Sequence, residues 1–269
     1  MPLFHLILVA LIQGITEFLP ISSSGHLVLL PLLTGLDDQG LLIDVAAHLG
    51  TLVAVVIYFW SDVRAALYGT GRLMRGKVDT QGAWLALCLA IATVPVVIVG
   101  ALFSLFGISE LLRSVEVIAW ATLLFGLLLY WADTRSPATK VQKNLSLKDA
   151  IRLGLWQALA LIPGTSRSGI TITGARFLGY TREDGARIAM LMSIPTILAS
   201  GTLAASEAIY SAAPWGELVL VAALSCLAAF AALALMMRLL KSVSFTPYVL
   251  YRVVLGSVLL ALVYGGVLT

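Results

Sequence analysis

Six long apolar stretches, separated by more polar ones, run along the chain. They cover residues 44–60, 84–106, 114–132, 187–206, 217–238 and 247–267. A helix needs roughly 20 apolar residues to cross about 30 Å of hydrocarbon, so each stretch predicts a transmembrane helix. The pattern therefore predicts an all-α polytopic membrane protein with six transmembrane helices in one integral membrane domain, residues 1–269.

Two further apolar segments, 3–35 and 150–176, are interrupted in the middle. Pro20 and a run of serines break the first, and the sequence PGTSRSG at 163–169 breaks the second. Irregular backbone at membrane depth is tolerated only where protein or a water-filled cavity surrounds it. Both segments are therefore predicted to be re-entrant helical hairpins.

The basic residues predict the orientation of these elements. Loops 61–80, 133–149, 176–187 and 238–246 carry arginine, three of them with lysine as well, whereas 34–44 carries three aspartates and neither basic residue. The positive-inside bias places the basic loops in the cytoplasm and 34–44, with both termini, outside. Because the loops before and after 150–176 are both predicted inside, this segment must enter and leave the membrane on one face.

The two interrupted segments resemble each other. WQALALIPGTSRSGITIT (156–173) and IQGITEFLPISSSGHLVL (12–29) both place a glutamine six or seven residues before a proline, followed by Ser-x-Ser-Gly. Three spans follow each hairpin, and an odd number of crossings turns the second unit upside down. We therefore expect an inverted-topology repeat, about 1–132 and 150–269, joined by the cytoplasmic loop 133–149, with the hairpin tips meeting near the midplane.

The composition is typical of a membrane protein and limits the kinds of partner that the chain can be expected to bind. The chain is 60% hydrophobic and 12% charged, against roughly 25% charged in soluble domains, and its mean hydropathy is +1.00. A net charge of +3 without a basic tract argues against nucleic-acid binding. Cys88 and Cys226 lie in separate apolar runs and are interpreted as core residues. Membrane lipids are the expected surroundings.

Polar groups at the hairpin tips are candidates for chemistry, because ionisable groups inside a membrane are expensive and by default mark a site. In the first hairpin Gln13 and Glu17 share a helix face, and Ser23 and His26 are expected within reach of each other around Gly25. In the second hairpin Arg167 stands among small and hydroxylated residues, a setting that suits phosphate oxygens. These neighbours are Gly164, Thr165, Ser166, Ser168 and Gly169. Together the tips suit phosphoryl transfer.

Other interpretations stay open at this point. Glu17 and Arg167 could form a buried ion pair that fixes the fold, and serine and glycine runs commonly serve close helix packing in membranes. His5 and His48 are interpreted as structural. A lipid-phosphate transporter or flippase would also use inverted repeats with broken helices, although it would not need a Ser-His pair on one tip only. A structural membrane protein with no ligand would leave the buried polar groups unexplained.

The motifs resemble those of the undecaprenyl-diphosphate phosphatase family of bacterial membranes, also called the bacitracin-resistance family. The family's first signature matches Gln13-Gly-Ile-Thr-Glu17, Pro20 and Ser22-Ser23-Ser24-Gly25-His26, and its second matches Pro163 to Gly169. Position 13 is glutamine where some members have glutamate. The length and the layout also match, so the resemblance covers essentially the whole chain.

The resemblance implies hydrolysis of undecaprenyl diphosphate to undecaprenyl phosphate and inorganic phosphate, which recycles the lipid carrier for peptidoglycan synthesis and confers bacitracin resistance. It implies a multi-pass protein of the bacterial plasma membrane with its active site open to the outer face. Glu17, Ser23, His26 and Arg167 are the implied catalytic residues. Either Ser23 or His26 could be the nucleophile. The implied supporting residues are Ser22, Ser24, Gly25, Gly164, Thr165, Ser166, Ser168 and Gly169.

The resemblance also implies a divalent cation, Mg²⁺ or Ca²⁺. Glu17 is a candidate ligand and Gln13 a lesser one. With a single carboxylate in this helix, the diphosphate itself is expected to supply much of the coordination. The expected partner is a polyprenyl diphosphate lipid, and assembly as a homodimer is left open.

Overall fold

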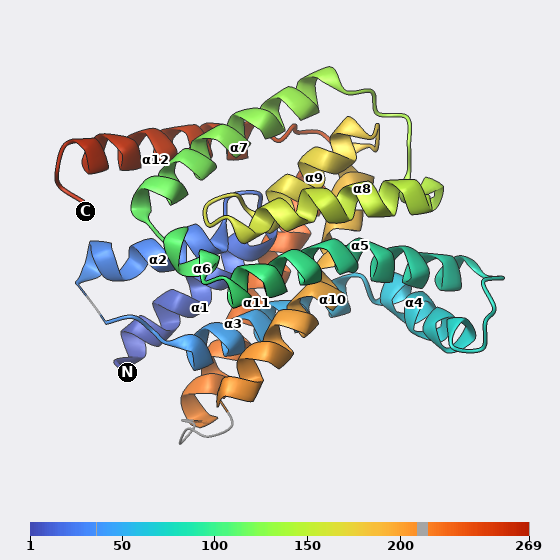
Figure 1. Cartoon of the computed structure of the whole chain (residues 1–269), viewed down its shortest axis with the longest axis horizontal. Helices are drawn as coiled ribbons and strands as arrows, with labels where there is room; N and C mark the ends of the chain where they lie inside the picture. Colours follow the sequence, from blue (N-terminus) through green and yellow to red (C-terminus); the bar gives the residue numbers. More distant parts are fainter. Residues whose placement is uncertain (36, 209–214, 269) are drawn as a thin grey trace.

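A computed structural model describes the backbone of residues 1–35, 37–208 and 215–268, and the side chains of these residues except 33 and 203–208. Within these ranges the chain is helical, with the elements arranged as in Figure 1. The helices are α1 (Leu3–Phe18), α2 (Ser23–Thr34), α3 (Leu41–Tyr58), α4 (Trp60–Leu73), α5 (Gln81–Leu105), α6 (Ile108–Leu111), α7 (Val115–Arg135), η1 (Gln142–Asn144), α8 (Leu147–Ala158), η2 (Leu159–Leu161), α9 (Arg167–Phe177), α10 (Arg182–Ala208), α11 (Trp215–Leu239) and α12 (Thr246–Tyr264).

In the described part of the chain, five helices are long and apolar enough to cross a membrane. They are α3, α5, α7, α11 and α12, which correspond to five of the six expected spans. The sixth expected span, 187–206, falls within α10, but its last residues lie among side chains outside the described set. The prediction of an all-helical, multi-pass membrane protein is therefore confirmed. The count of six spans stays a prediction.

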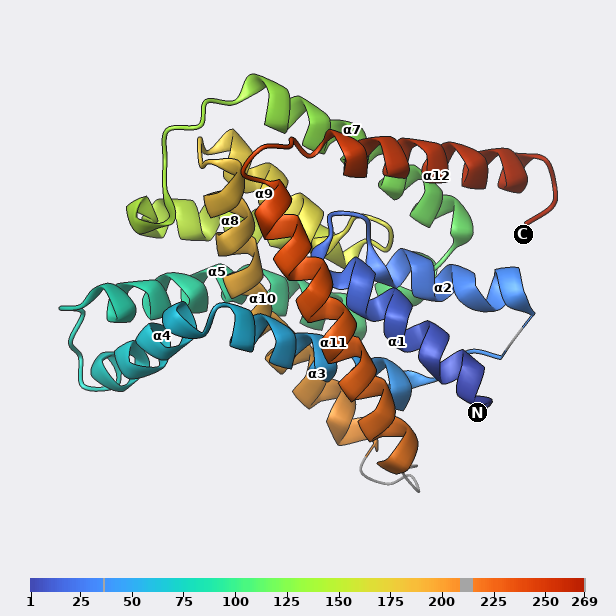
Figure 2. The same ribbon diagram turned by 180° about the vertical axis from the view of Figure 1, so that it is seen from behind.

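Each interrupted segment is a pair of helices joined by a short loop. In 3–35 the chain leaves α1 at Phe18 and begins α2 at Ser23, and in 150–176 it leaves α8 and η2 before α9 begins at Arg167. In both cases a proline lies in the connection, where a missing N–H and a fixed φ end a helix. The two helix pairs meet at the centre of the molecule, with α7 and α12 side by side above them (Figures 1 and 2).

The stretch after α3 differs from the sequence prediction. Residues 61–80 were expected to form a loop, but most of this stretch is the helix α4. A Cβ on Gly69 would lie 2.2 Å from the backbone of Gly82 in α5, and a Cβ on Gly82 would lie 2.2 Å from the Ala65 oxygen. Because both positions are glycine, the backbones of α4 and α5 can lie in direct contact, and this packing stabilises α4. The charged residues of 61–80 had favoured the prediction of a loop.

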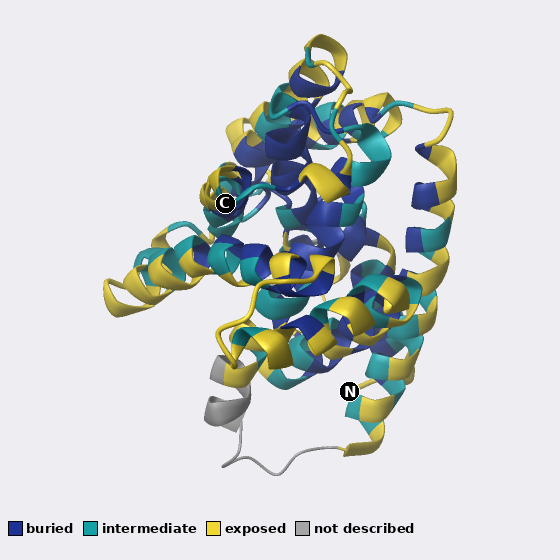
Figure 3. Cartoon of the chain, turned by 90° about the vertical axis from the view of Figure 1, so that its right-hand side faces the viewer, coloured by how far each residue is buried: buried dark blue, intermediate teal, exposed yellow. Residues whose placement is uncertain are grey.

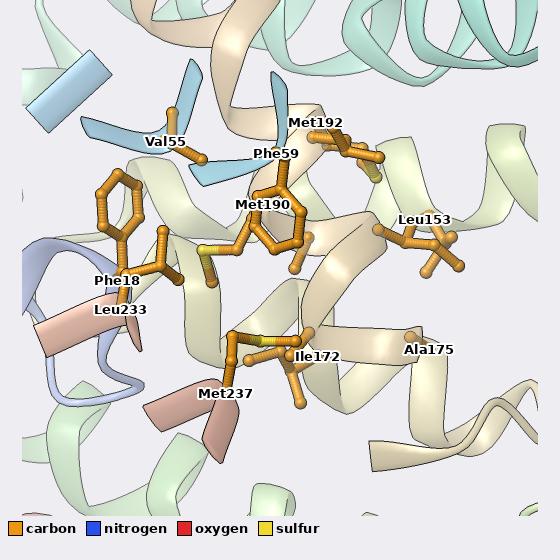
Figure 4. Packing of buried hydrophobic residues seen from close by; sticks show 14 of the residues in the cluster. Phe18, Val55, Phe59, Leu153, Ile172, Ala175, Met190, Met192, Leu233 and Met237 are labelled. Atoms are coloured by element: carbon orange, nitrogen blue, oxygen red, sulfur yellow. The ribbon is translucent and has the colours of Figure 1, made fainter. Parts of the chain in front are cut away.

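The main core draws buried side chains from most of the long helices, including helices of both hairpins. Figure 4 shows buried side chains from α1, α3, α8, α9, α10 and α11 in contact. Lipid tails are as apolar as these side chains, so close packing rather than exclusion of water holds them together. Glycine brings the helices near enough: a Cβ on Gly50 of α3 would lie 2.1 Å from the Ala222 oxygen of α11. The core therefore fixes α1 and α3, which carry Glu17 and His48.

The outward faces of the spans are apolar. Figure 3 shows buried residues gathered in the interior and exposed residues on the outer faces of the helices. Large exposed apolar side chains include Val53, Ile98, Leu124, Leu227 and Val258 on the five candidate spans. In water such surfaces would be a liability, whereas lipid accepts them.

Candidate active site

The two hairpin tips have the same local structure. Ser22 and Ser166 are the N-caps of α2 and α9, with φ/ψ of 75°/93° and 70°/111°, and they are the non-glycine residues with positive φ in the part of the chain that is described. Each hydroxyl accepts a hydrogen bond from the backbone N–H three residues on, Gly25 at 3.3 Å and Gly169 at 3.2 Å. The Ser-x-Ser-Gly motifs therefore start both helices in the same way.

The tips touch each other. Ser168 Oγ donates to the Leu19 carbonyl across the hairpins at 2.9 Å. A Cβ on Gly25 would lie 3.7 Å from Gly164 Cα, and one on Gly164 would lie 2.4 Å from the Ile118 oxygen. Glycine is required at position 164 because its backbone lies too close to Ile118 of α7 for any side chain, whereas Gly25 lies at an ordinary contact distance from Gly164.

Glu17 is the centre of a buried polar cluster. Its Oε2 accepts hydrogen bonds from Ser23 Oγ at 2.6 Å and Gln13 Nε2 at 3.0 Å, and its Oε1 pairs with Arg167 Nη2 at 2.5 Å. The side chain of Glu17 is 6% exposed and that of Arg167 14% exposed. The cluster thus joins a hydroxyl, a carboxylate and a guanidinium from both hairpins.

His26 lies outside the Glu17 cluster and bonds to other residues. Its Nδ1 lies 2.7 Å from the Ser22 carbonyl oxygen, so Nδ1 donates, and its Nε2 lies 2.5 Å from the hydroxyl of Tyr251 in α12. The two rings stack with centroids 5.7 Å apart. The expected Ser23–His26 contact is therefore replaced, because each side chain bonds to another partner.

The supporting residues differ in their settings. Thr165 is buried and its Oγ1 has no hydrogen-bond partner, whereas Ser24 is exposed and lies 3.3 Å from Ser22 Oγ. Ser166 Oγ lies 3.2 Å from Ser168 Oγ. These hydroxyls shape the two loops, and that of Thr165 is buried without a hydrogen-bond partner.

Two contacting residues, Tyr251 and Arg252, were missed by the sequence analysis, and a third, His48, was interpreted there as structural. Tyr251 bonds to His26, and its neighbour Arg252 is fully buried and donates to carbonyls of both hairpins, Pro20 at 3.3 Å and Gly164 at 3.1 Å. His48 Nε2 lies 3.8 Å from Glu17 Oε2. An arginine inside a predicted span, such as Arg252, is expensive and was a usable signal.

A cation site built from protein ligands does not fit these residues. The described part of the chain holds no group of three or more His, Cys, Asp or Glu side chains that could bind a metal. Arg167 pairs with Glu17 and would compete with a cation for the carboxylate. Gln13 Oε1 is buried without a partner, and a single amide oxygen is far fewer than the six ligands that Mg²⁺ or Ca²⁺ takes.

The sequence matches a known family over most of its length. A family model described as bacitracin resistance protein BacA matches residues 6–258. Similar proteins include the undecaprenyl-diphosphatases of Roseobacter denitrificans, 63% identical, and Jannaschia sp., 62% identical, each covering 98% of this chain and 100% of the relative. Undecaprenyl-diphosphatase 2 of Stutzerimonas stutzeri is 44% identical over the same shares of both chains. This chain therefore belongs to the bacitracin resistance protein BacA family.

Proposed function

We propose that this chain hydrolyses undecaprenyl diphosphate to undecaprenyl phosphate and inorganic phosphate in the bacterial plasma membrane. The observation that carries the proposal is the cluster in which Glu17 accepts from Ser23 and pairs with Arg167. It unites a nucleophile, a base and a cation for phosphate oxygens. The names of relatives 62–63% identical over nearly the whole chain point to the same reaction. Recycling of the lipid carrier and bacitracin resistance follow from that reaction.

Ser23 is the nucleophile that the geometry favours over His26. As Ser23 Oγ bonds to the terminal phosphorus, its proton passes to Glu17 Oε2, 2.6 Å away, and the P–O bond to the lipid phosphate breaks. Glu17 gives this proton to the departing lipid phosphate. Water then attacks the phosphoserine, Glu17 takes one proton from that water and returns it to Ser23 Oγ, and the P–Oγ bond breaks to release inorganic phosphate. Both nitrogens of His26 are already engaged, by Ser22 and Tyr251, which leaves no free lone pair for attack on phosphorus.

Arg167 is the group that binds the terminal phosphate. Its guanidinium pairs with Glu17 across the two hairpins, and its planar fork matches phosphate oxygens. His26, whose Nδ1 donates to the carbonyl of the N-cap Ser22 and whose Nε2 bonds to Tyr251, is assigned to holding the start of α2 in place. The divalent cation is assigned to the diphosphate oxygens and to no residue of this chain, because the donor set around Glu17 does not suit it.

The membrane arrangement is part of the proposal. We take α1–α2 and α8–α9 as re-entrant hairpins and α10 as the sixth span, in inverted repeats of about 1–132 and 150–269. The paired conformations of Ser22 and Ser166 support this symmetry. The site then lies near the midplane, open to the outer face, with 133–149 in the cytoplasm.

The test is phosphate release by the purified full-length protein in detergent. Wild type should release phosphate from undecaprenyl diphosphate. Ser23→Ala and Arg167→Ala should each lower kcat at least about 100-fold, the usual range for loss of a positioned catalytic group. Ser242→Ala, an exposed position outside the site, is the control. Turnover that survives both site variants would contradict the assignment.

The same preparation identifies the nucleophile. Acid quenching of enzyme incubated with substrate labelled in the terminal phosphate should trap an acid-stable label that Ser23→Ala abolishes. An acid-labile label that persists in Ser23→Ala would instead assign the attack to His26.

A further inference from the structure

His48 lies beside the proposed base although neither hairpin motif contains it. It belongs to α3, and its Nε2 is 3.8 Å from Glu17 Oε2. The His48 side chain is 36% exposed, whereas that of Glu17 is 6% exposed. His48 is thus the more accessible neighbour of the buried carboxylate.

The imidazole of His48 is held in one orientation. Its Nδ1 lies 2.8 Å from the Asp44 carbonyl oxygen, which can only accept, so Nδ1 donates and the ring cannot turn over without losing this bond. The backbone beneath it is fixed as well: Thr51 Oγ1 donates to the His48 carbonyl at 2.8 Å, and Gly50 packs against Ala222 of α11. Nε2 is therefore kept facing Glu17.

Arg167 has two partners in the proposed reaction. It pairs with Glu17 Oε1, and in the proposed reaction it also binds the terminal phosphate. Its other recorded partner is the Ala189 carbonyl at 3.3 Å. When the guanidinium turns to the phosphate, Oε1 loses its cation, while Ser23 and Gln13 hold Oε2 alone. A buried carboxylate that loses its charged partner needs another one.

We propose that His48 is a positioning residue that acts through Glu17. As Arg167 turns to the phosphate, His48 in its imidazolium form, with a proton on each ring nitrogen, donates its Nε2–H to the carboxylate and keeps Oε2 in line with Ser23 Oγ. Catalytic hydrogen bonds are often long in the free enzyme and tighten when substrate binds, which is consistent with a separation of 3.8 Å. The inference rests on the proposed phosphatase activity, because it concerns how that site keeps its base in place.

Steady-state kinetics of the purified full-length protein with undecaprenyl diphosphate test this role. His48→Leu cannot bond to Glu17, and His48→Asn is too short to reach it, so each should lower kcat about 10- to 100-fold, as misplacement of a reacting group does. KM should stay within about twofold, because His48 does not touch the substrate. His48→Gln can still donate to Glu17 and should keep kcat within about fivefold of wild type, since a neutral donor is weaker than a charged one.

The matched control is His5→Leu. His5 is a buried histidine of α1, 12 residues before Glu17, or about 18 Å along the helix, and this variant should keep wild-type kcat. If His48→Leu does not purify as a folded protein, the kcat of His48→Asn tests the positioning role instead.

The inference is overturned by wild-type kcat in His48→Leu and His48→Asn, by a loss in His48→Gln as large as theirs, or by a loss confined to KM. A wild-type protein that releases no phosphate would overturn the proposed function instead.

Discussion

Gly164 occupies a backbone position that no other residue can take at low cost. Its φ is +87°, and a Cβ would lie 2.4 Å from the Ile118 oxygen and 2.9 Å from Ile118 Cα. Gly164→Ala should therefore destabilise the fold by about 2–4 kcal/mol, about 1 from the left-handed conformation and the rest from displacing backbone. Thermal unfolding in detergent measures the loss.

The control for this prediction separates the two costs. Gly76 also has a positive φ, +70°, but a Cβ there would meet nothing within 4 Å. Gly76→Ala should cost only about 1 kcal/mol. Equal melting temperatures for the two variants would show that the hairpin does not press against α7 as closely as the structure indicates.

Individual site residues could be recognised from the sequence where their type was out of place. Glu17, Ser23 and Arg167 stood out because charges and hydroxyls interrupt apolar segments, and the structure brings these three together. His48 did not stand out, because a single histidine in a span looks the same whether it faces a carboxylate or a helix. Its role depends on which helices pack together, and no local pattern contains that information.

At the scale of elements, one side chain ties α12 to both hairpins and to α7. Arg252 donates to the carbonyls of Pro20, Gly164, Thr122 and Ala121. Arg252→Met removes these four hydrogen bonds, each worth about 0.5–1.5 kcal/mol net. Part of this is offset because the cost of burying the charge also disappears. The net loss should be about 2–4 kcal/mol in thermal unfolding, with kcat at least about tenfold lower because both tips loosen.

Arg152→Met is the matched control for Arg252. Arg152 is exposed on α8, so the same substitution there should shift the melting temperature little. If both variants melted together with wild type, the hairpins would be held by their own contacts, such as Ser168 to Leu19, and not by α12.

The helices themselves were more predictable than their contacts. The start of α2 and of α9 could be placed from proline and the Ser-x-Ser-Gly motif, because capping depends on neighbouring residues alone. The helix α4 could not, since its stability comes from Gly69 and Gly82 meeting across two elements. The bonds from α12 to the hairpins were missed for the same reason, because they join residues more than 80 positions apart.

The orientation of the whole molecule in the membrane depends on whether the two ends of α8–α9 lie on the same side of the bilayer. If this pair re-enters, 133–149 and 238–246 share the cytoplasmic side, and 34–44 lies outside. Cysteines introduced at the exposed positions Asp37, Ala138 and Lys241 report this in a Cys88→Ala/Cys226→Ala background. A membrane-impermeant maleimide added to intact bacterial cells should label Asp37→Cys only, and permeabilised cells should show all three labelled. Labelling of Lys241→Cys in intact cells would mean that α8–α9 crosses the bilayer, because one extra crossing reverses every later loop, and the inverted repeat would then be wrong.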